Sequence, residues 1–148
     1  MIHPKGQIKL DTGWDSNIDF YPLSITSPAK FEGLFKGFRK LRAVTWVASP
    51  ELVLKFFEAP FEFEEIELIV GDKIVDSYRN SLVSKNVNVT DEILNKIQGG
   101  NLTIYGSDRP LHTKLYILEA YNHIRIINGS ANLTKEARKA HQINCVDV

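Results

Sequence analysis

Short apolar runs that alternate with helical segments constrain the fold of this chain more than any other feature. Prolines near the start of two segments and Gly99-Gly100 at the end of another give boundary signals. Strands are expected at 42–49, 65–70 and 101–105, and helices at 27–40, 52–58, 72–83 and 90–98. Strands separated by helical crossovers favour a mixed, mostly parallel sheet that is covered on both faces.

The last third of the chain predicts a hairpin. Strands are expected at 115–118 and 124–127 around a turn at 121–123, followed by a helix at 134–140 and a strand at 143–148. If the first strand extends back to His112, then His112 and Lys114 point to the same side, because side chains two apart in a strand share a face. A nucleophile and a cation are then presented together.

A second polar group follows the hairpin. Gly129-Ser130 lies at the exit of the second strand, with Asn132 two residues further on. This exit is beside the start of the first strand, where His112 and Lys114 stand. The two pieces together predict half of a site that cleaves phosphodiesters.

This pairing resembles the HxK(x)4D…GSxN signature of the phospholipase D superfamily. His112, Lys114, Ser130 and Asn132 match its His, Lys, Ser and Asn, and Glu119 stands where the signature has Asp. The resemblance implies a three-layer α/β/α sandwich with a mixed, mostly parallel sheet, formed as one phospholipase D-like domain over residues 1–148. The signature ends close to the end of the chain, so we expect the domain to be the N-terminal part of a longer protein.

The resemblance also implies a mechanism. In such enzymes one histidine attacks phosphorus to form a covalent phosphohistidine, and a second histidine protonates the leaving oxygen. This chain contains one copy of the signature, so we expect a homodimer in which His112 of each copy faces a shared cleft. Lys114, Ser130 and Asn132 would hold the phosphoryl oxygens. The scheme needs no metal and no cofactor, and the four histidines show no ligand-like spacing.

One departure from the family concerns an acidic residue beyond the signature that helps to orient the histidine. The corresponding stretch here is Gln142-Ile143-Asn144, and neither Gln142 nor Asn144 can carry a negative charge. An amide can still orient an imidazole, but it does not stabilise the charged form. The sequence therefore predicts slow or absent turnover.

Charge and composition limit the partners. Eighteen basic and eighteen acidic residues give zero net charge, so any anion site is local. The predicted 134–140 helix begins beside the phosphate pocket and could contact DNA through Lys135, Arg138 and Lys139. The single Cys145 excludes an internal disulfide, and no apolar run has the length of a membrane span or signal peptide. We expect a cytoplasmic protein without a membrane partner.

Three functions fit these patterns. The first is a metal-independent nuclease that cleaves DNA. The second is a lipid or other small phosphodiesterase, which would usually carry an interfacial apolar loop or two signature copies, and the sequence shows neither. The third is a weak or inactive module that binds DNA or dimerises within a larger helicase or restriction enzyme. The first is preferred, and the third is the main alternative.

Overall fold

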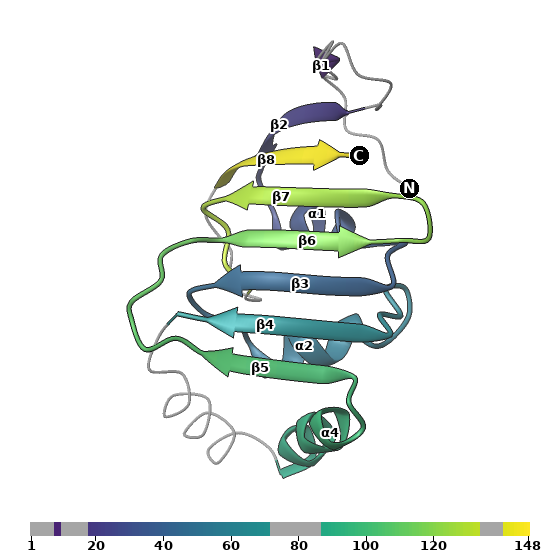
Figure 1. Cartoon of the computed structure of the whole chain (residues 1–148), viewed down its shortest axis with the longest axis vertical. Coiled ribbons are helices and arrows are strands. Elements are labelled where there is room, and N and C mark those ends of the chain that lie inside the picture. Colours follow the sequence, from purple (N-terminus) through teal and green to yellow (C-terminus); the bar gives the residue numbers. More distant parts are fainter. Residues whose placement is uncertain (1–7, 10–17, 72–86, 134–140) are drawn as a thin grey trace.

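The computed structural model describes residues 8–9, 18–71, 87–133 and 141–148 (Figure 1). Their helices and strands follow one another as β1 (Ile8–Lys9), β2 (Asp19–Ile25), α1 (Pro28–Gly33), β3 (Lys40–Thr45), α2 (Pro50–Phe56), β4 (Glu65–Val70), α4 (Val87–Gln98), β5 (Leu102–Gly106), β6 (Leu115–Glu119), β7 (Ile124–Gly129) and β8 (His141–Asp147).

The described strands form one eight-stranded mixed sheet in the order β1-β2-β8-β7-β6-β3-β4-β5. Only β3–β4 and β4–β5 pair in parallel, whereas the other five of the seven pairings are antiparallel. The expectation of a mostly parallel sheet is therefore wrong. Strands that are separated by helices favoured parallel pairing in the sequence pattern. In the structure, the hairpin β6–β7 reverses the chain without a helix. Strand β8 then pairs with β7, and β2 pairs with β8, both in antiparallel orientation.

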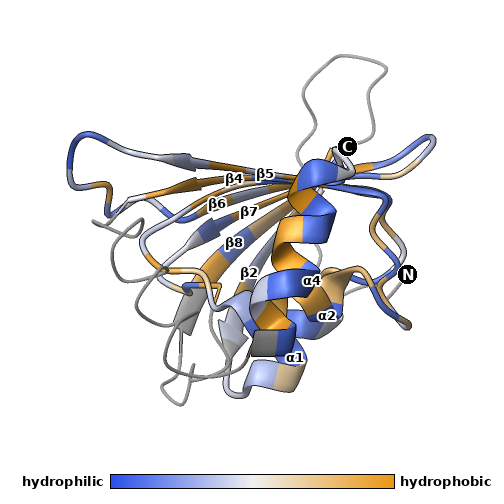
Figure 2. Ribbon diagram, turned by 90° about the horizontal axis from the view of Figure 1, so that it is seen from below, coloured by the Kyte–Doolittle hydropathy of each residue, from blue (hydrophilic) through white to orange (hydrophobic). Residues whose placement is uncertain are grey.

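The described helices α1, α2 and α4 lie on one face of the sheet (Figure 2). On that face β3 buries Leu41, Ala43 and Thr45, while the alternate positions look the other way. The opposite face has a groove lined largely by apolar side chains, among them Val44, Ile69, Tyr105, Leu115 and Ile117. The predicted helices at 72–83 and 134–140 lie outside the described residues, so the third layer stays a prediction.

The helix boundaries differ from expectation at α1 and α4. The apolar residues of 27–40 do reach the core, but α1 ends at Gly33 and the chain turns through Gly37, whose φ is +87°. Ser27 and Ser49 cap α1 and α2 by accepting hydrogen bonds from the backbone N–H three residues on. Helix α4 begins at Val87, three residues before the expected Thr90.

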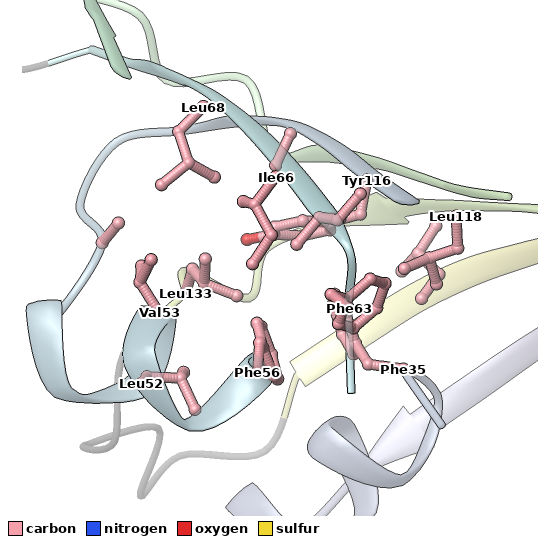
Figure 3. Packing of buried hydrophobic residues seen from close by; sticks show 14 of the residues in the cluster. Phe35, Leu52, Val53, Phe56, Phe63, Ile66, Leu68, Tyr116, Leu118 and Leu133 are labelled. Atoms are coloured by element: carbon pink, nitrogen blue, oxygen red, sulfur yellow. The ribbon is translucent and has the colours of Figure 1, made fainter. Parts of the chain in front are cut away.

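An aromatic cluster fills the core between α1, α2 and the sheet. The Phe35 ring stacks on Phe56 at a centroid distance of 5.0 Å and meets Tyr116 edge-on at 5.5 Å. Figure 3 shows Tyr116 entering this cluster from β6, together with Ile66 of β4. Tyr116 thus carries a hydroxyl into an apolar interior, where it must find a partner.

A buried ion pair joins the last two strands to the turn after α1. Arg125 donates from Nε and Nη2 to the Asp147 carboxylate at 2.7 and 2.8 Å, and from Nη1 to the Leu34 carbonyl at 3.1 Å. His123 packs against Phe38 and lies 3.6 Å from Asp147. The sequence pattern predicted a solvated turn at His123, but the residue is half-buried at the edge of this ion pair.

Candidate phosphodiester-binding site

One edge of the sheet gathers the residues of the signature. Strands β3, β4, β5 and β7 end at this edge and β6 begins there, because Val44 of β3 and Asn128 of β7 both pair with Leu115 of β6 (Figure 1). Binding sites often occupy the carboxyl ends of strands in open α/β sheets. The segment 107–114 runs along this edge from β5 to β6.

The residues His112 and Lys114 lie in that segment rather than in a strand. The expectation that the strand extends back to His112 is wrong, since β6 begins at Leu115. Pro110 has no N–H to donate, and the preceding residues bind the end of β4 instead, where Ser107 N–H donates to Val70 O at 3.0 Å. His112 is exposed and Lys114 is half-buried.

Gly71, directly after β4, lets the segment come this close. Leu111 N–H donates to the Gly71 carbonyl at 3.4 Å. A Cβ added to Gly71 would lie 2.4 Å from the Leu111 carbonyl oxygen, well inside van der Waals contact. Glycine is therefore needed here for the approach of the segment that carries His112.

A backbone contact joins the two halves of the signature. Gly129 N–H donates to the Lys114 carbonyl at 3.3 Å, one residue beyond the last β6–β7 pair. The Lys114 ammonium group donates to the His112 carbonyl at 2.8 Å, so the cation lies beside the backbone of the histidine. Ser130 follows β7 directly and is exposed.

Two buried hydroxyls hold the loop that carries Asn132. Tyr116 Oη donates to the Ala131 carbonyl at 2.6 Å, and burial raises the pKa of this phenol far above its ordinary value, which keeps it a neutral donor. Thr45 Oγ1 donates to Val47 O at 2.9 Å and lies 3.4 Å from Leu133 N and 3.5 Å from Asn132 Oδ1. The Asn132 amide is therefore held next to the end of β3 through Oδ1.

The indole of Trp46 stacks on the imidazole of His112. The ring centroids are 4.5 Å apart and the planes differ by 7°. Trp46 directly follows β3, so it reaches the site from the central part of the sheet. Within the described residues, no hydrogen bond to either imidazole nitrogen is present.

The expected supporting residues do not lie together. Glu119 is at the far end of β6 from Lys114 and forms an ion pair with Arg42 of β3, which also pairs with Glu67 of β4 at 3.0 Å. Glu119 therefore joins strands and makes no contact with His112. Asn144 is exposed in β8 opposite Asn128, and the backbone of Gln142 pairs with Ser24 of β2.

The predicted DNA-contacting residues Lys135, Arg138 and Lys139 lie outside the described residues. In the described ranges, no group of three His, Cys, Asp or Glu side chains is arranged to hold a metal ion. The same ranges contain no helix with the length and apolar character that a membrane crossing requires.

Sequence reasoning missed Thr45, Trp46 and Tyr116. Thr45 and Trp46 fell inside an expected buried strand, and Tyr116 looked like an ordinary strand residue. A polar Thr followed by an aromatic at the carboxyl end of a buried run was the available signal. This signal indicates a site only when β3 is known to pair with β6.

The sequence matches no protein-family model, and it matches no curated protein. Its fold is similar to three crystal structures of yeast tyrosyl-DNA phosphodiesterase, two of mutants and one of the enzyme itself. The TM-scores are 0.53, 0.57 and 0.54, the sequence identities are 15%, 15% and 14%, and each alignment covers 88% of this chain. The alignments cover 31%, 30% and 32% of the yeast chains, so this chain spans about a third of their length.

Proposed function

We propose that this chain is a phospholipase D-like phosphodiesterase domain that cleaves DNA without a metal, through a covalent phosphohistidine on His112. The observation that carries the proposal is the Gly129–Lys114 backbone contact, which brings the HxK and GSxN pieces to one sheet edge. The fold similarity to yeast tyrosyl-DNA phosphodiesterase, itself a phospholipase D superfamily member, supports the same assignment.

Each residue has a chemical role in the proposed reaction. A ring nitrogen of His112 attacks phosphorus, the P–N bond forms, and the bond from phosphorus to the leaving oxygen breaks. The Lys114 ammonium, the Ser130 hydroxyl and the Asn132 amide stabilise charge on the remaining phosphoryl oxygens. Water then hydrolyses the P–N bond and regenerates the histidine.

The leaving oxygen needs a proton donor that one half-site does not provide. We propose a two-fold homodimer in which His112 of the second copy donates this proton. The name of the yeast enzyme points to a phosphodiester in DNA as the substrate class. The third layer, the cytoplasmic location and the place of the domain in a longer protein stay predictions.

Cleavage of a labelled DNA duplex and single strand in excess chelator tests the function. We expect wild-type cleavage to persist, because Lys114 and Asn132 supply the charge stabilisation that a metal gives other enzymes. His112→Ala should abolish cleavage, and Lys114→Ala should slow it by about 10²- to 10³-fold. Both variants should stay folded, since neither side chain lies in the core.

The matched control is Lys36→Ala, which removes an exposed lysine from the turn after α1 and should leave cleavage unchanged. Cleavage that needs added metal, or that survives His112→Ala, would contradict the proposed mechanism. It would point to a different or contaminating nuclease.

One observation favours the alternative of a weak or inactive DNA-binding module. Gln142 and Asn144 are neutral, and the described residues provide no carboxylate that contacts His112. Under this alternative the pocket would still bind DNA or phosphate in a salt-dependent manner. His112→Ala would weaken this binding, and the wild type and the variant would show the same low or absent turnover.

A further inference from the structure

Trp46 stacks on His112, the one signature residue whose side chain is a ring. His112 is exposed and lies outside a strand, so neither core packing nor a sheet ladder fixes its side chain. The Trp46 indole lies parallel to the imidazole at 4.5 Å, within the range of attractive aromatic contacts. The contact therefore selects one plane for a ring that would otherwise rotate.

A stacked contact suits a nucleophile because it uses the face of the ring. Both imidazole nitrogens lie at the edge, and the described residues leave both without a hydrogen bond. A carboxylate that orients a histidine occupies one nitrogen. The indole can set the ring plane without occupying either nitrogen.

The position of Trp46 in the chain links this contact to the other half of the signature. Its neighbour Thr45 is fully buried and lies within 3.5 Å of Asn132 and Leu133. Successive residues in a strand point to opposite faces. The end of β3 thus meets the Asn132 loop through Thr45 and the His112 ring through Trp46.

We infer that Trp46 is a positioning residue, which holds the His112 imidazole in the plane that attack on phosphorus requires. It takes the place of the orienting carboxylate that the described residues do not provide. The effect on turnover rests on the proposed function. The orientation of the ring does not depend on the proposed function, and it can be measured in a protein without activity.

The test compares Trp46→Leu and Trp46→Phe by NMR and by steady-state kinetics. The His112 ring protons, assigned with His112→Asn, should resonate upfield in the wild type because they lie over the indole. Trp46→Leu should move them downfield and lower kcat for DNA cleavage by about 10- to 100-fold with KM unchanged. Trp46→Phe keeps a flat ring and should retain most of both properties.

Tyr105→Leu, which removes an exposed aromatic at the end of β5, is the matched control and should change neither readout. Unchanged His112 resonances in Trp46→Leu would overturn the inference, as would shifted resonances with a wild-type kcat. If the wild type does not cleave DNA, the proposed function fails, and the NMR comparison alone decides whether the indole stacks on the His112 ring in solution.

Discussion

At the scale of single residues, Tyr116 links the core to the site. Its ring packs among Phe31 and Phe35, while its hydroxyl donates to the carbonyl of Ala131, one residue before Asn132. A buried carbonyl that loses its donor keeps its full desolvation cost. The tyrosine therefore stabilises the loop by a hydrogen bond that phenylalanine cannot make.

Tyr116→Phe should lower the free energy of unfolding by about 1–3 kcal/mol, because it leaves the Ala131 carbonyl unsatisfied without changing the packing of the ring. Urea denaturation followed by circular dichroism measures the change. Tyr105→Phe, at an exposed tyrosine in β5, should alter stability by less than about 0.5 kcal/mol. Equal stability of Tyr116→Phe and the wild type would show that the hydroxyl is not needed.

At the scale of elements, strand register decides which residues reach the site. In β8, Ile143 pairs with Gly129 and Asn144 pairs with Asn128. The backbone of Gln142 is thus one step beyond Gly129, toward the edge that carries Ser130. Glu119 stands at the opposite end of β6, although it is near His112 in sequence.

The sequence predicted the existence of most described elements and the meeting of the two signature pieces. The strand at 65–70 matches β4, and the hairpin matches β6 and β7 within two residues. It could not predict that β6 pairs with β3, because that pairing joins strands more than 70 residues apart. The contacts of Trp46 with His112 and of Thr45 with Asn132 depend on this pairing and were therefore missed.

Gln142→Glu should raise the rate of DNA cleavage by about tenfold, since a carboxylate near the site edge could stabilise a charged imidazole. Asn144→Glu is the matched control, with the same charge two residues further from that edge, and should give a smaller gain. Single-turnover rates measure both. A larger gain at Asn144 would mean that backbone register does not decide which position supports His112.

At the scale of the whole molecule, the described chain is a mixed sheet with helices on one face (Figures 1 and 2), and the residues of the proposed half-site lie at one edge. The yeast structures of similar fold are about three times longer than this chain. In the proposed mechanism, a second copy supplies the proton donor. The proposed mechanism therefore requires both a covalent intermediate on His112 and a dimer.

Native mass spectrometry of the domain incubated with a labelled DNA duplex in excess chelator tests both requirements at once. The expected species contains two chains and one covalently attached DNA fragment. The attachment should be labile to acid and stable to alkali, should map to His112, and should be absent from His112→Asn. A wild-type protein that cleaves DNA as a monomer, or that forms its adduct at a residue other than His112, would contradict the proposed mechanism.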